Sequence, residues 1–540
     1  MQTETDGRAD YDFSKKDLIA VLAPLLGGNG RRKKGMTDKQ DFVSAAGALP
    51  ENEYLLLQLV AVLYEPVSTH FLCKLYLSLD HFLLGEYRPR FDEVSGMLAR
   101  LRHEGFLSAS NQCTAELAEI LLRASIEQKR FSRLAAYVEQ SAPMDYQHGR
   151  WPMRCWRAVR QFRIGLYSQD FDRIDQGMTF LEHAECSTVF FGVSPILRIL
   201  TCAFSADWFS ALSTPIQFYI LDYTVKKVAT DLSAATALFA YLQDEVPIRI
   251  PREEQIPFLR LLATVCIYQG KFSFFAQILQ EQTESFVGSG MRGTLLFLQG
   301  EFSRSLSAFA EDRQQLAEFA GDDSLTFFGL PGFFYILSIL YCGDEATFPL
   351  AEQAVEKGLL HSRGGSDELP LLCLRAFLGY RRGKDPDLLE LTAALAAEKR
   401  SVSMLLALII LHWMGVETAP EFRTRLKGLY GIAQKRGYFW LSEEAAALLL
   451  ALQEHDSQEN EHRREESRLL HLVDLFPSPT SWQHSLSELI ETVTAIRQPE
   501  QTRRLSWFVT FTGKTLMLFP REQRRNSRGK WSKGRAISCN

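Results

Sequence analysis

The sequence predicts a mainly α-helical protein whose central part is a solenoid of stacked helix pairs. Three observations lead to this fold class. From Leu121 to about Leu475 the chain is a succession of apolar windows with helical spacing, and hardly any segment alternates as strands do. Short polar breaks of similar form separate these windows. A chain of 540 residues also exceeds the usual size of one hydrophobic core, which favours a repeat array or several domains.

The composition excludes wholesale disorder and gives no overall preference for a charged partner. Hydrophobic residues make up 46% of the chain and charged residues 23%, which leaves ample apolar material for a packed interior. A formal net charge of -5 is small for this length, so neither nucleic acid nor an anionic membrane is indicated for the molecule as a whole. Any electrostatic partner must therefore be recognised locally.

The sequence favours a cytoplasmic location without membrane contact. Nine cysteines are scattered singly, and no Cys-x-x-Cys occurs, which is typical of reduced thiols. The amino terminus from Met1 to Lys16 is polar and acidic and lacks the apolar core of a secretory signal. The most apolar window, Met404 to Met414, is shorter than the roughly 20 residues that span a bilayer.

Residues 1–50 are predicted to form a flexible leader. A short apolar stretch, Leu18 to Leu26, is followed by Gly27-Gly28-Asn29-Gly30 and by the basic run Arg31 to Lys34. The glycines do not have the Gly-x-x-x-x-Gly-Lys-Ser/Thr order of a phosphate-binding loop. We therefore expect no nucleotide site in the leader.

Residues 51–125 resemble a winged helix. Two apolar helical segments, Tyr54–Leu63 and Val67–Leu79, precede a third helix from Phe91 to His103, and Phe106–Asn111 follows as a short ribbon. In a DNA-binding interpretation the third helix offers Arg100, Arg102 and His103 to the major groove. Three acids, Asp92, Glu93 and Glu104, offset those bases and weaken the electrostatic attraction. We therefore favour a packing module ahead of helical repeats, an arrangement similar to that in bacterial signalling proteins, and keep DNA contact as the alternative.

Residues 126–475 are predicted to form the solenoid itself. The break Gln269-Gly270-Lys271-Phe272 returns as Gln299-Gly300-Glu301-Phe302, and looser copies lie at residues 129–131, 169–171 and 382–384. In this pattern a helix ends at a glycine, and an aromatic residue heads the next helix and packs into the pair. Each pair leaves an apolar face for its neighbour, so an array with a long concave surface results. The pattern resembles tetratricopeptide repeats, with a generic helical bundle as the alternative.

Residues 476–540 are predicted to be a small separate module. The capping-box sequence Thr480–Gln483 opens a helix with one apolar stripe, formed by Trp482, Leu486, Leu489, Ile490, Val493 and Ile496. Two β-prone runs, Leu505–Phe511 and Thr515–Phe519, flank a turn at Gly513 and predict a hairpin. A basic tail then offers candidate nucleic-acid-binding residues, namely Arg521, Arg524, Arg525, Arg528, Lys530, Trp531, Lys533 and Arg535. A solvated terminus explains such a charge cluster equally well.

The carboxy-terminal motifs are similar to a segment of large bacterial Swi/Snf-type helicases. Leu505-Ser506-Trp507-Phe508, the Pro520–Arg525 stretch and Gly529–Ala536 carry this resemblance. In that family the segment lies between a long helical region and a DNA-dependent ATPase motor. Here no Walker loop occurs, and Asp344-Glu345-Ala346-Thr347 matches the acidic magnesium box only in its first letters. The resemblance therefore implies the amino-terminal, motor-free portion of such a helicase or a separately encoded companion.

The sequence predicts neither an enzyme nor a metal or cofactor site. Histidines never stand four residues apart as in a helical zinc pair, and no Gly-x-Ser-x-Gly elbow occurs. We expect a non-catalytic accessory or recruitment region that binds a protein partner through the solenoid and approaches DNA or a helicase motor through the basic tail. The alternative is a winged-helix transcription regulator whose helical repeats sense a partner.

Overall fold

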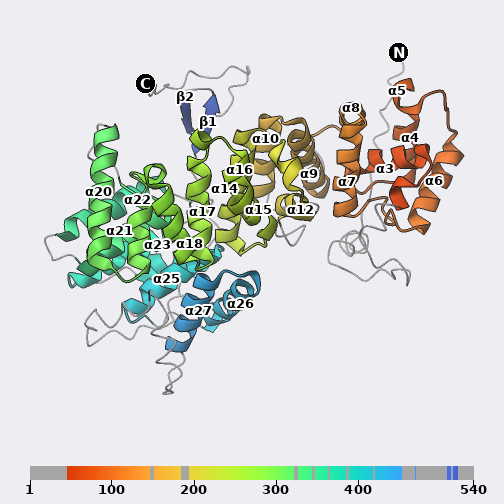
Figure 1. Ribbon diagram of the computed structural model, residues 1–540. Coiled ribbons are helices and arrows are strands. Elements are labelled where there is room, and N and C mark those ends of the chain that lie inside the picture. The colour runs from red at the N-terminus through yellow and green to blue at the C-terminus, as the bar shows by residue number, and fades with distance from the viewer. Residues whose placement is uncertain are drawn as a thin grey trace, which may run out of the picture. The chain divides into compact units, whose positions relative to one another are not determined.

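The computed structural model describes residues 45–145, 151–183, 194–202, 204–320, 326–342, 347–362, 365, 367–384, 388–416, 420–452, 469, 507–512 and 515–520. Over these residues the protein is mainly helical, which confirms the predicted fold class at that level (Figure 1). No helix in the described part of the chain is long and apolar enough to cross a membrane. The helices form two compact units, one of residues up to 220 with 235–249, the other of residues 221–234 and from 250 onward. This division falls within the segment 126–475 that we predicted as one solenoid.

The first unit contains most of the described helices before residue 250. Their bounds are α3 Glu51–Leu63, α4 Thr69–Leu77, α5 His81–Leu84, α6 Phe91–His103, α7 Ala115–Glu127, α8 Phe131–Ser141, α9 Trp151–Ser168, α10 Phe171–His183, α12 Pro195–Cys202, α13 Ala206–Ser210, α14 Thr214–Asp231, α15 Thr236–Ala240, the π-helix η1 Tyr241–Glu245 and α16 Val246–Arg249. The last part of α14 belongs to the second unit.

Short polar side chains begin several of these helices. The Ser68 hydroxyl accepts the Phe71 N–H at 3.2 Å at the start of α4, and the Asp80 carboxylate accepts the Leu83 N–H at 3.1 Å at the start of α5. Thr114 caps α7 in the same way. Such caps satisfy amide groups that a helix leaves without partners in its first turn.

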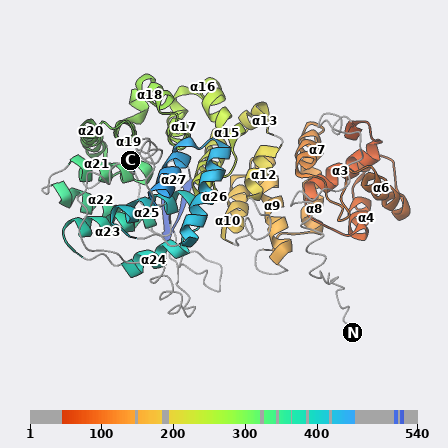
Figure 2. The same cartoon turned by 90° about the horizontal axis from the view of Figure 1, so that it is seen from below.

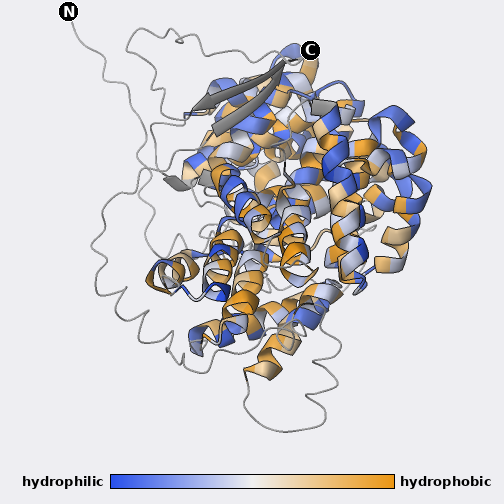
Figure 3. Ribbon diagram, turned by 90° about the vertical axis from the view of Figure 1, so that its left-hand side faces the viewer, coloured by the Kyte–Doolittle hydropathy of each residue, from blue (hydrophilic) through white to orange (hydrophobic). Residues whose placement is uncertain are grey.

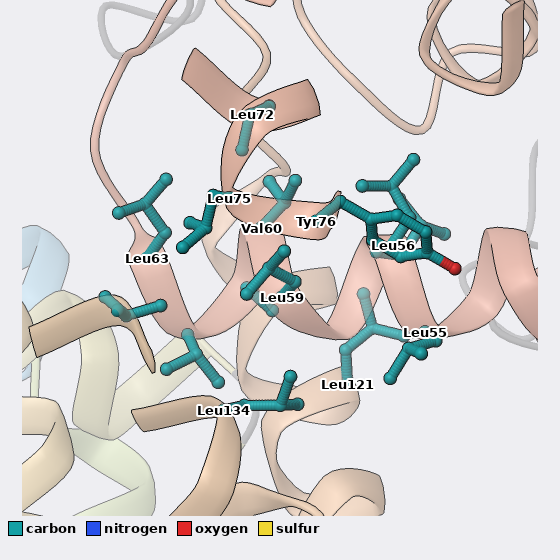
Figure 4. Close-up of a cluster of buried hydrophobic side chains, with 14 of the residues drawn as sticks. Leu55, Leu56, Leu59, Val60, Leu63, Leu72, Leu75, Tyr76, Leu121 and Leu134 are labelled. Atoms are coloured by element: carbon teal, nitrogen blue, oxygen red, sulfur yellow. The ribbon is translucent and has the colours of Figure 1, made fainter. Parts of the chain in front are cut away.

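The core of the first unit is built around α3. Every residue of α3 from Leu55 to Leu63 is buried, because α4, α7, α8 and α9 all pack against it. Figure 4 shows side chains of α3, α4, α7 and α8 gathered in one cluster, with Leu59, Leu75, Leu121 and Leu134 among them. A helix that is apolar on all sides is a central helix, and α3 has that position here.

Helices α3, α4 and α6 coincide with the three helices predicted in the winged-helix-like segment. The ribbon predicted at Phe106–Asn111 is absent, because the backbone turns instead of forming paired strands. The Ser108 N–H donates to the Gln112 carbonyl at 2.8 Å, and Asn111 has a left-handed φ of 58°. The Asn111 side chain also donates to the Val67 carbonyl at 2.9 Å, which holds the turn against the connection between α3 and α4.

The polar breaks predicted between helices are corners of one type. At Gly270, with φ of 68°, the Gly270 N–H donates to the Ile267 carbonyl at 3.0 Å and the Lys271 N–H to the Cys266 carbonyl at 2.9 Å. This pair of bonds defines the Schellman motif, which ends a helix with a left-handed residue. Gly300 and Gly383 form the same two bonds at φ of 80° and 73°. The prediction of a recurring glycine break is confirmed.

Two of the three looser copies of the break use residues other than glycine for the same turn. Lys129 and Gln169 have φ of 59° and 56°. The next residues, Arg130 and Asp170, donate their N–H groups to carbonyls five residues back, each at 2.8 Å. Because a left-handed backbone strains a side chain with a Cβ atom, these corners depend on the surrounding packing.

Aromatic residues at the heads of helices join one pair to the next. The rings of Phe302, first in α20, and Tyr341 in α21 have centroids 3.8 Å apart. Phe171, first in α10, and Tyr219 in α14 are 4.9 Å apart. Phe131, first in α8, contacts Tyr167 of α9 in the same way. The aromatic residue predicted at the head of a helix thus packs against a helix that follows later in the chain.

The second unit contains the remaining described elements. Their bounds are η2 Arg252–Glu254, α17 Ile256–Tyr268, α18 Phe272–Glu281, η3 Thr283–Phe286, α19 Met291–Leu298, α20 Phe302–Ala320, α21 Gly329–Cys342, α22 Phe348–His361, α23 Glu368–Arg381, α24 Leu388–Ala397, α25 Ser401–Trp413, α26 Pro420–Arg436, α27 Phe439–Ala451, and the strands β1 Trp507–Thr512 and β2 Thr515–Pro520. The strands pair antiparallel, with Trp507 opposite Pro520 and Thr512 opposite Thr515.

The helices of the second unit pack in chain order, and the last pair returns to the first. From α19 to α23 each helix contacts the next, and α25 packs on α23. Polar and apolar residues share most of these helices, as expected where one face is buried (Figure 3). Helix α27 contacts both α17 and α25 and lies between them (Figure 2).

Two kinds of contact hold α27 at the start of the second unit. Trp440 is fully buried and its ring lies 6.2 Å from that of Phe334 on α21. The Tyr438 hydroxyl donates to the Ser233 carbonyl at 2.6 Å, and the Arg436 guanidinium donates to the Leu232 carbonyl. The inner side of this array is therefore occupied by the chain's own helix α27.

Candidate functional site

The residues predicted to bind nucleic acid lie outside the described residues. They are Arg521, Arg524, Arg525, Arg528, Lys530, Trp531, Lys533 and Arg535. The predicted helix from Trp482 to Ile496 lies outside them as well.

Helix α6 uses two of its three candidate DNA-contacting bases to hold the fold together. Arg100 donates to the carboxylate of Glu53 on α3, with Nε at 2.8 Å. Arg102 donates to the Thr69 hydroxyl on α4 at 3.3 Å and to the Leu98 carbonyl at 3.2 Å. Arg100 and His103 are both exposed, and of the three bases His103 alone has no such contact to another helix. These contacts favour the packing interpretation of the helix.

The most unusual polar feature of the described residues is a set of buried ion pairs on α9. Arg163 and Glu119 are both fully buried, with Nε 2.7 Å from the carboxylate oxygen. Glu119 also accepts the Tyr167 hydroxyl at 2.7 Å, and Arg163 donates to the Ala61 carbonyl of α3 at 2.5 Å. The guanidinium lies 4.1 Å from the ring centroid of Tyr64. One arginine therefore joins α3, α7 and α9.

A second ion-pair group lies one helical turn earlier on α9. Glu65, just past the end of α3, is 3.3 Å from Arg157 and 3.7 Å from Arg160. Arg160 is fully buried and also donates to the Ala142 carbonyl at the end of α8. Tyr64, between the two groups, has a left-handed φ of 51°. A bulky residue in that conformation is strained, so its neighbours must stabilise it.

Burial and ion pairing shift the pKa values of these groups in opposite directions. Burial raises the pKa of Glu65, while Arg160 and Arg157 oppose the rise. Burial lowers the pKa of Arg160. For Arg163 burial again favours the neutral form, but Glu119, Tyr64 and Tyr167 outweigh it and raise the pKa. These charges are buried and each faces an opposite charge, so the network fixes helix packing, while Nε of Arg160 and Nη2 of Arg163 are buried without an acceptor.

Sequence reasoning missed this network, although one signal was present. Arginines recur every third residue along α9, at Arg154, Arg157, Arg160 and Arg163. Three residues advance 300° around a helix, so such a row drifts by about 60° per step and cannot stay on one solvated face. Some members must point inward, where each requires an acidic partner.

No group of three or more histidine, cysteine or acidic side chains in the described part of the chain has metal-binding geometry. His70 lies against the ring of Phe91, and His81 contacts the Gly85 carbonyl through Nδ1. Among the cysteines that the structure describes, the free thiols are Cys73, Cys113, Cys202, Cys266, Cys342 and Cys373. Cys155 is disulfide-bonded, so the prediction of reduced thiols is wrong for that residue.

The second unit has a shallow apolar hollow between α21, α22, α23 and α25. Phe327, Phe333, Ile336, Leu371 and Leu406 are among its lining residues. Asp367 and Ser362 are the polar residues of the lining. The hollow is small and mainly apolar, which is more typical of imperfect packing between helices than of a ligand cavity.

Comparisons with known proteins add no assignment to this geometry. No model of a protein family matches the chain, and neither the curated proteins nor the solved structures that were compared give a significant match.

Proposed function

We propose that the chain is a non-catalytic accessory region of a Swi/Snf-type helicase system. In this proposal the helical repeats bind a protein partner, and the basic segment Arg521–Arg535 approaches DNA or the helicase motor in the cytoplasm. The observation that supports it best is the repeated Schellman corner, with an aromatic residue joining successive helix pairs, because this is the construction principle of tetratricopeptide-like solenoids. Extended faces of stacked pairs are suited to binding other polypeptides.

The structure of the second unit narrows where a protein partner can bind. Because α27 fills the space between α17 and α25, a partner of this unit is expected on the outer surface of the helix pairs and not against the inner side. The proposal therefore needs no rearrangement of the described helices.

The internal contacts of α6 favour the tail as the DNA-contacting region. Arg100 and Arg102 are engaged with Glu53 and Thr69, so using them on DNA would cost these contacts. A winged-helix regulator, the alternative function, would instead place α6 in the major groove. The two functions therefore predict different residues for any DNA contact.

Binding of the full chain to a labelled duplex, measured by fluorescence anisotropy at several salt concentrations, separates the two functions. Each phosphate contact adds about 0.9 to the slope of log affinity against log salt. We expect Arg524→Gln, Arg525→Gln and Arg528→Gln together to reduce that slope by about 3, whereas Arg100→Gln with Arg102→Gln leaves it unchanged.

Three results would contradict the proposal. Loss of DNA binding in the variant with Arg100→Gln and Arg102→Gln alone would support the alternative function, a winged-helix regulator. If neither variant changes the slope of log affinity against log salt, neither region contacts DNA. ATP turnover by the purified chain would overturn the non-catalytic assignment.

A further inference from the structure

The connection between α4 and α6 exposes an unusual concentration of large apolar side chains. Leu77, Phe82, Tyr87 and Phe91 are 37%, 57%, 37% and 39% exposed. We name these four residues the apolar patch. Scattered apolar residues on a surface are normal, but several along one short stretch are typical of a binding surface.

The apolar patch is held in place by the residues between its members. Leu79, Leu83 and Leu84 are buried in the core of the first unit. Asp80 pairs with Arg133 of α8 at 2.8 Å, and the Arg133 guanidinium also lies 3.9 Å from the Phe82 ring centroid. Since its backbone is anchored on both sides of Phe82, the patch is preformed, and binding to it costs little ordering of the surface.

We propose that the apolar patch is the docking surface for residues Leu18 to Leu26 of the same chain. This stretch, Leu-Ile-Ala-Val-Leu-Ala-Pro-Leu-Leu, is the one apolar run of the predicted leader. Its chemistry matches four exposed apolar side chains. A segment of nine residues is also long enough to cover several large side chains.

The path of the chain favours this occupant over others. The described residues begin at Ala45, shortly before α3, and the Tyr76 hydroxyl at the end of α4 donates to the Asn52 carbonyl at 3.0 Å. Leu77 is the next residue, so the patch begins close to where the leader joins α3. The linker from residue 27 to 44 is about 18 residues, and a flexible chain of that length has an end-to-end distance of about 23 Å.

Tethering assists the contact. A short flexible linker gives its end an effective concentration in the millimolar range, so a weak apolar contact suffices. Charge around the patch is mixed, because Glu86 and Asp92 are exposed beside Tyr87 and Phe91 but so are Arg88 and Arg90, so the tether and not charge selects this occupant. A second copy or another protein would bind without this tether.

Hydrogen exchange of the full chain, resolved by peptides over residues 16–27, tests the proposal. We expect the amides of residues 19–23 to exchange at least about tenfold more slowly than an unstructured chain. Phe82→Ser with Phe91→Ser should abolish this protection. Ile248→Ser, at a residue that is 80% exposed outside the patch, should leave it intact.

A reciprocal variant uses the leader itself. Val21→Asp with Leu22→Asp should speed exchange over residues 77–91, and Met36→Asp in the linker should not. Unprotected leader amides in the unmodified chain would overturn the proposal, as would protection that survives the loss of Phe82 and Phe91. A concentration-dependent dimer that Phe82→Ser abolishes would assign the patch to a second copy and overturn it as well.

Discussion

The two units turn their helices with the same corner but join neighbouring helices with different chemistry. In the first unit the buried arginines Arg160 and Arg163, on α9, pair with Glu65 after α3 and Glu119 on α7. Their partners come from helices distant in the sequence. In the second unit long-range contacts use apolar packing, as where Trp440 of α27 meets Phe334 of α21. They also use hydrogen bonds to backbone carbonyls, as at Ser233, and neither of these two kinds of contact is an ion pair.

The second unit also buries acidic side chains, and backbone or indole N–H groups satisfy two of them. Asp312 accepts the Gly290 N–H at 2.9 Å, at the start of α19. Glu444 accepts the Trp440 indole N–H at 3.1 Å, one turn away on α27. Such bonds fix helix ends and local conformation.

The two units therefore differ in the kind of interaction that fixes the position of a helix. A buried ion pair is satisfied only when one particular helix supplies the opposite charge, so the first unit specifies the position of α9 by charge. An apolar contact is satisfied by any complementary surface, so the second unit specifies its packing by volume and shape. Three substitutions test whether charge and volume determine the packing of the two units in this way.

The largest effect is expected at the fully buried ion pair. Arg163→Met leaves the Glu119 carboxylate buried with only the Tyr167 hydroxyl as a donor. Loss of one partner of a buried pair typically costs about 3 to 5 kcal/mol. The free energy of unfolding, measured by urea denaturation with circular dichroism, should fall by that amount.

Two further variants show whether the cost is electrostatic. Arg133→Met removes an ion pair with Asp80 whose side chains are 49% and 33% exposed, and it should cost less than about 1 kcal/mol. Arg163→Met with Glu119→Leu removes both charges and should recover most of the loss. If the single variant costs no more than Arg133→Met, charge does not determine the position of α9.

An intermediate effect is expected where volume determines the packing of the second unit. A Cβ atom on Gly293 of α19 would lie 2.6 Å from a ring carbon of Phe309, which is fully buried on α20. Gly293→Ala should therefore reduce the free energy of unfolding by about 1 to 3 kcal/mol, as overpacking does. Thermal denaturation measures the change.

The matched control lies on α26 of the same unit. A Cβ atom on Gly428 would meet nothing within 4 Å, so Gly428→Ala should be neutral or stabilise the unit by up to about 1 kcal/mol. Combining Gly293→Ala with Phe309→Leu should restore part of the lost stability. Equal effects at Gly293 and Gly428 would show that the contact between α19 and α20 adjusts freely.

What the sequence predicted correctly was encoded locally. A glycine, or a residue that tolerates a left-handed backbone, ends a helix within five residues, so the corners at Gly270 and Gly300 could be recognised from their own neighbourhood. The ribbon after α6 was predicted wrongly because the left-handed turn at Asn111 depends on its bond to Val67, more than forty residues earlier. Local patterns do not contain such a contact.

The features that sequence reasoning missed all involve distant partners. Arg160 and Arg163 have the composition of a solvated face until Glu65 and Glu119 are placed beside them. The return of α27 to α17 likewise depends on contacts between segments about 180 residues apart, which hydrophobic periodicity does not reveal. The candidate site in the tail rested on charge and motif alone and stays a prediction.

The smallest effect is expected within the first unit, as a pH dependence of the free energy of unfolding that arises from Glu65. Burial raises the pKa of Glu65 above its ordinary value of 4.5, even though two arginines oppose the rise. The folded protein thus keeps a proton on Glu65 at a pH where the unfolded chain has released it. The stabilisation linked to that proton is fully present below the unfolded pKa and is lost as the pH rises through the folded pKa.

Glu65→Gln removes this titration and keeps a side chain of similar size. The difference in free energy of unfolding, unmodified protein minus variant, should therefore decrease as the pH rises above the ordinary value of 4.5 and through the raised folded pKa. Urea denaturation at a series of pH values measures it. An increase over this range would mean that Arg157 and Arg160 outweigh the burial of Glu65, and the ion pair would then stabilise the joint at neutral pH as the pair of Glu119 and Arg163 does.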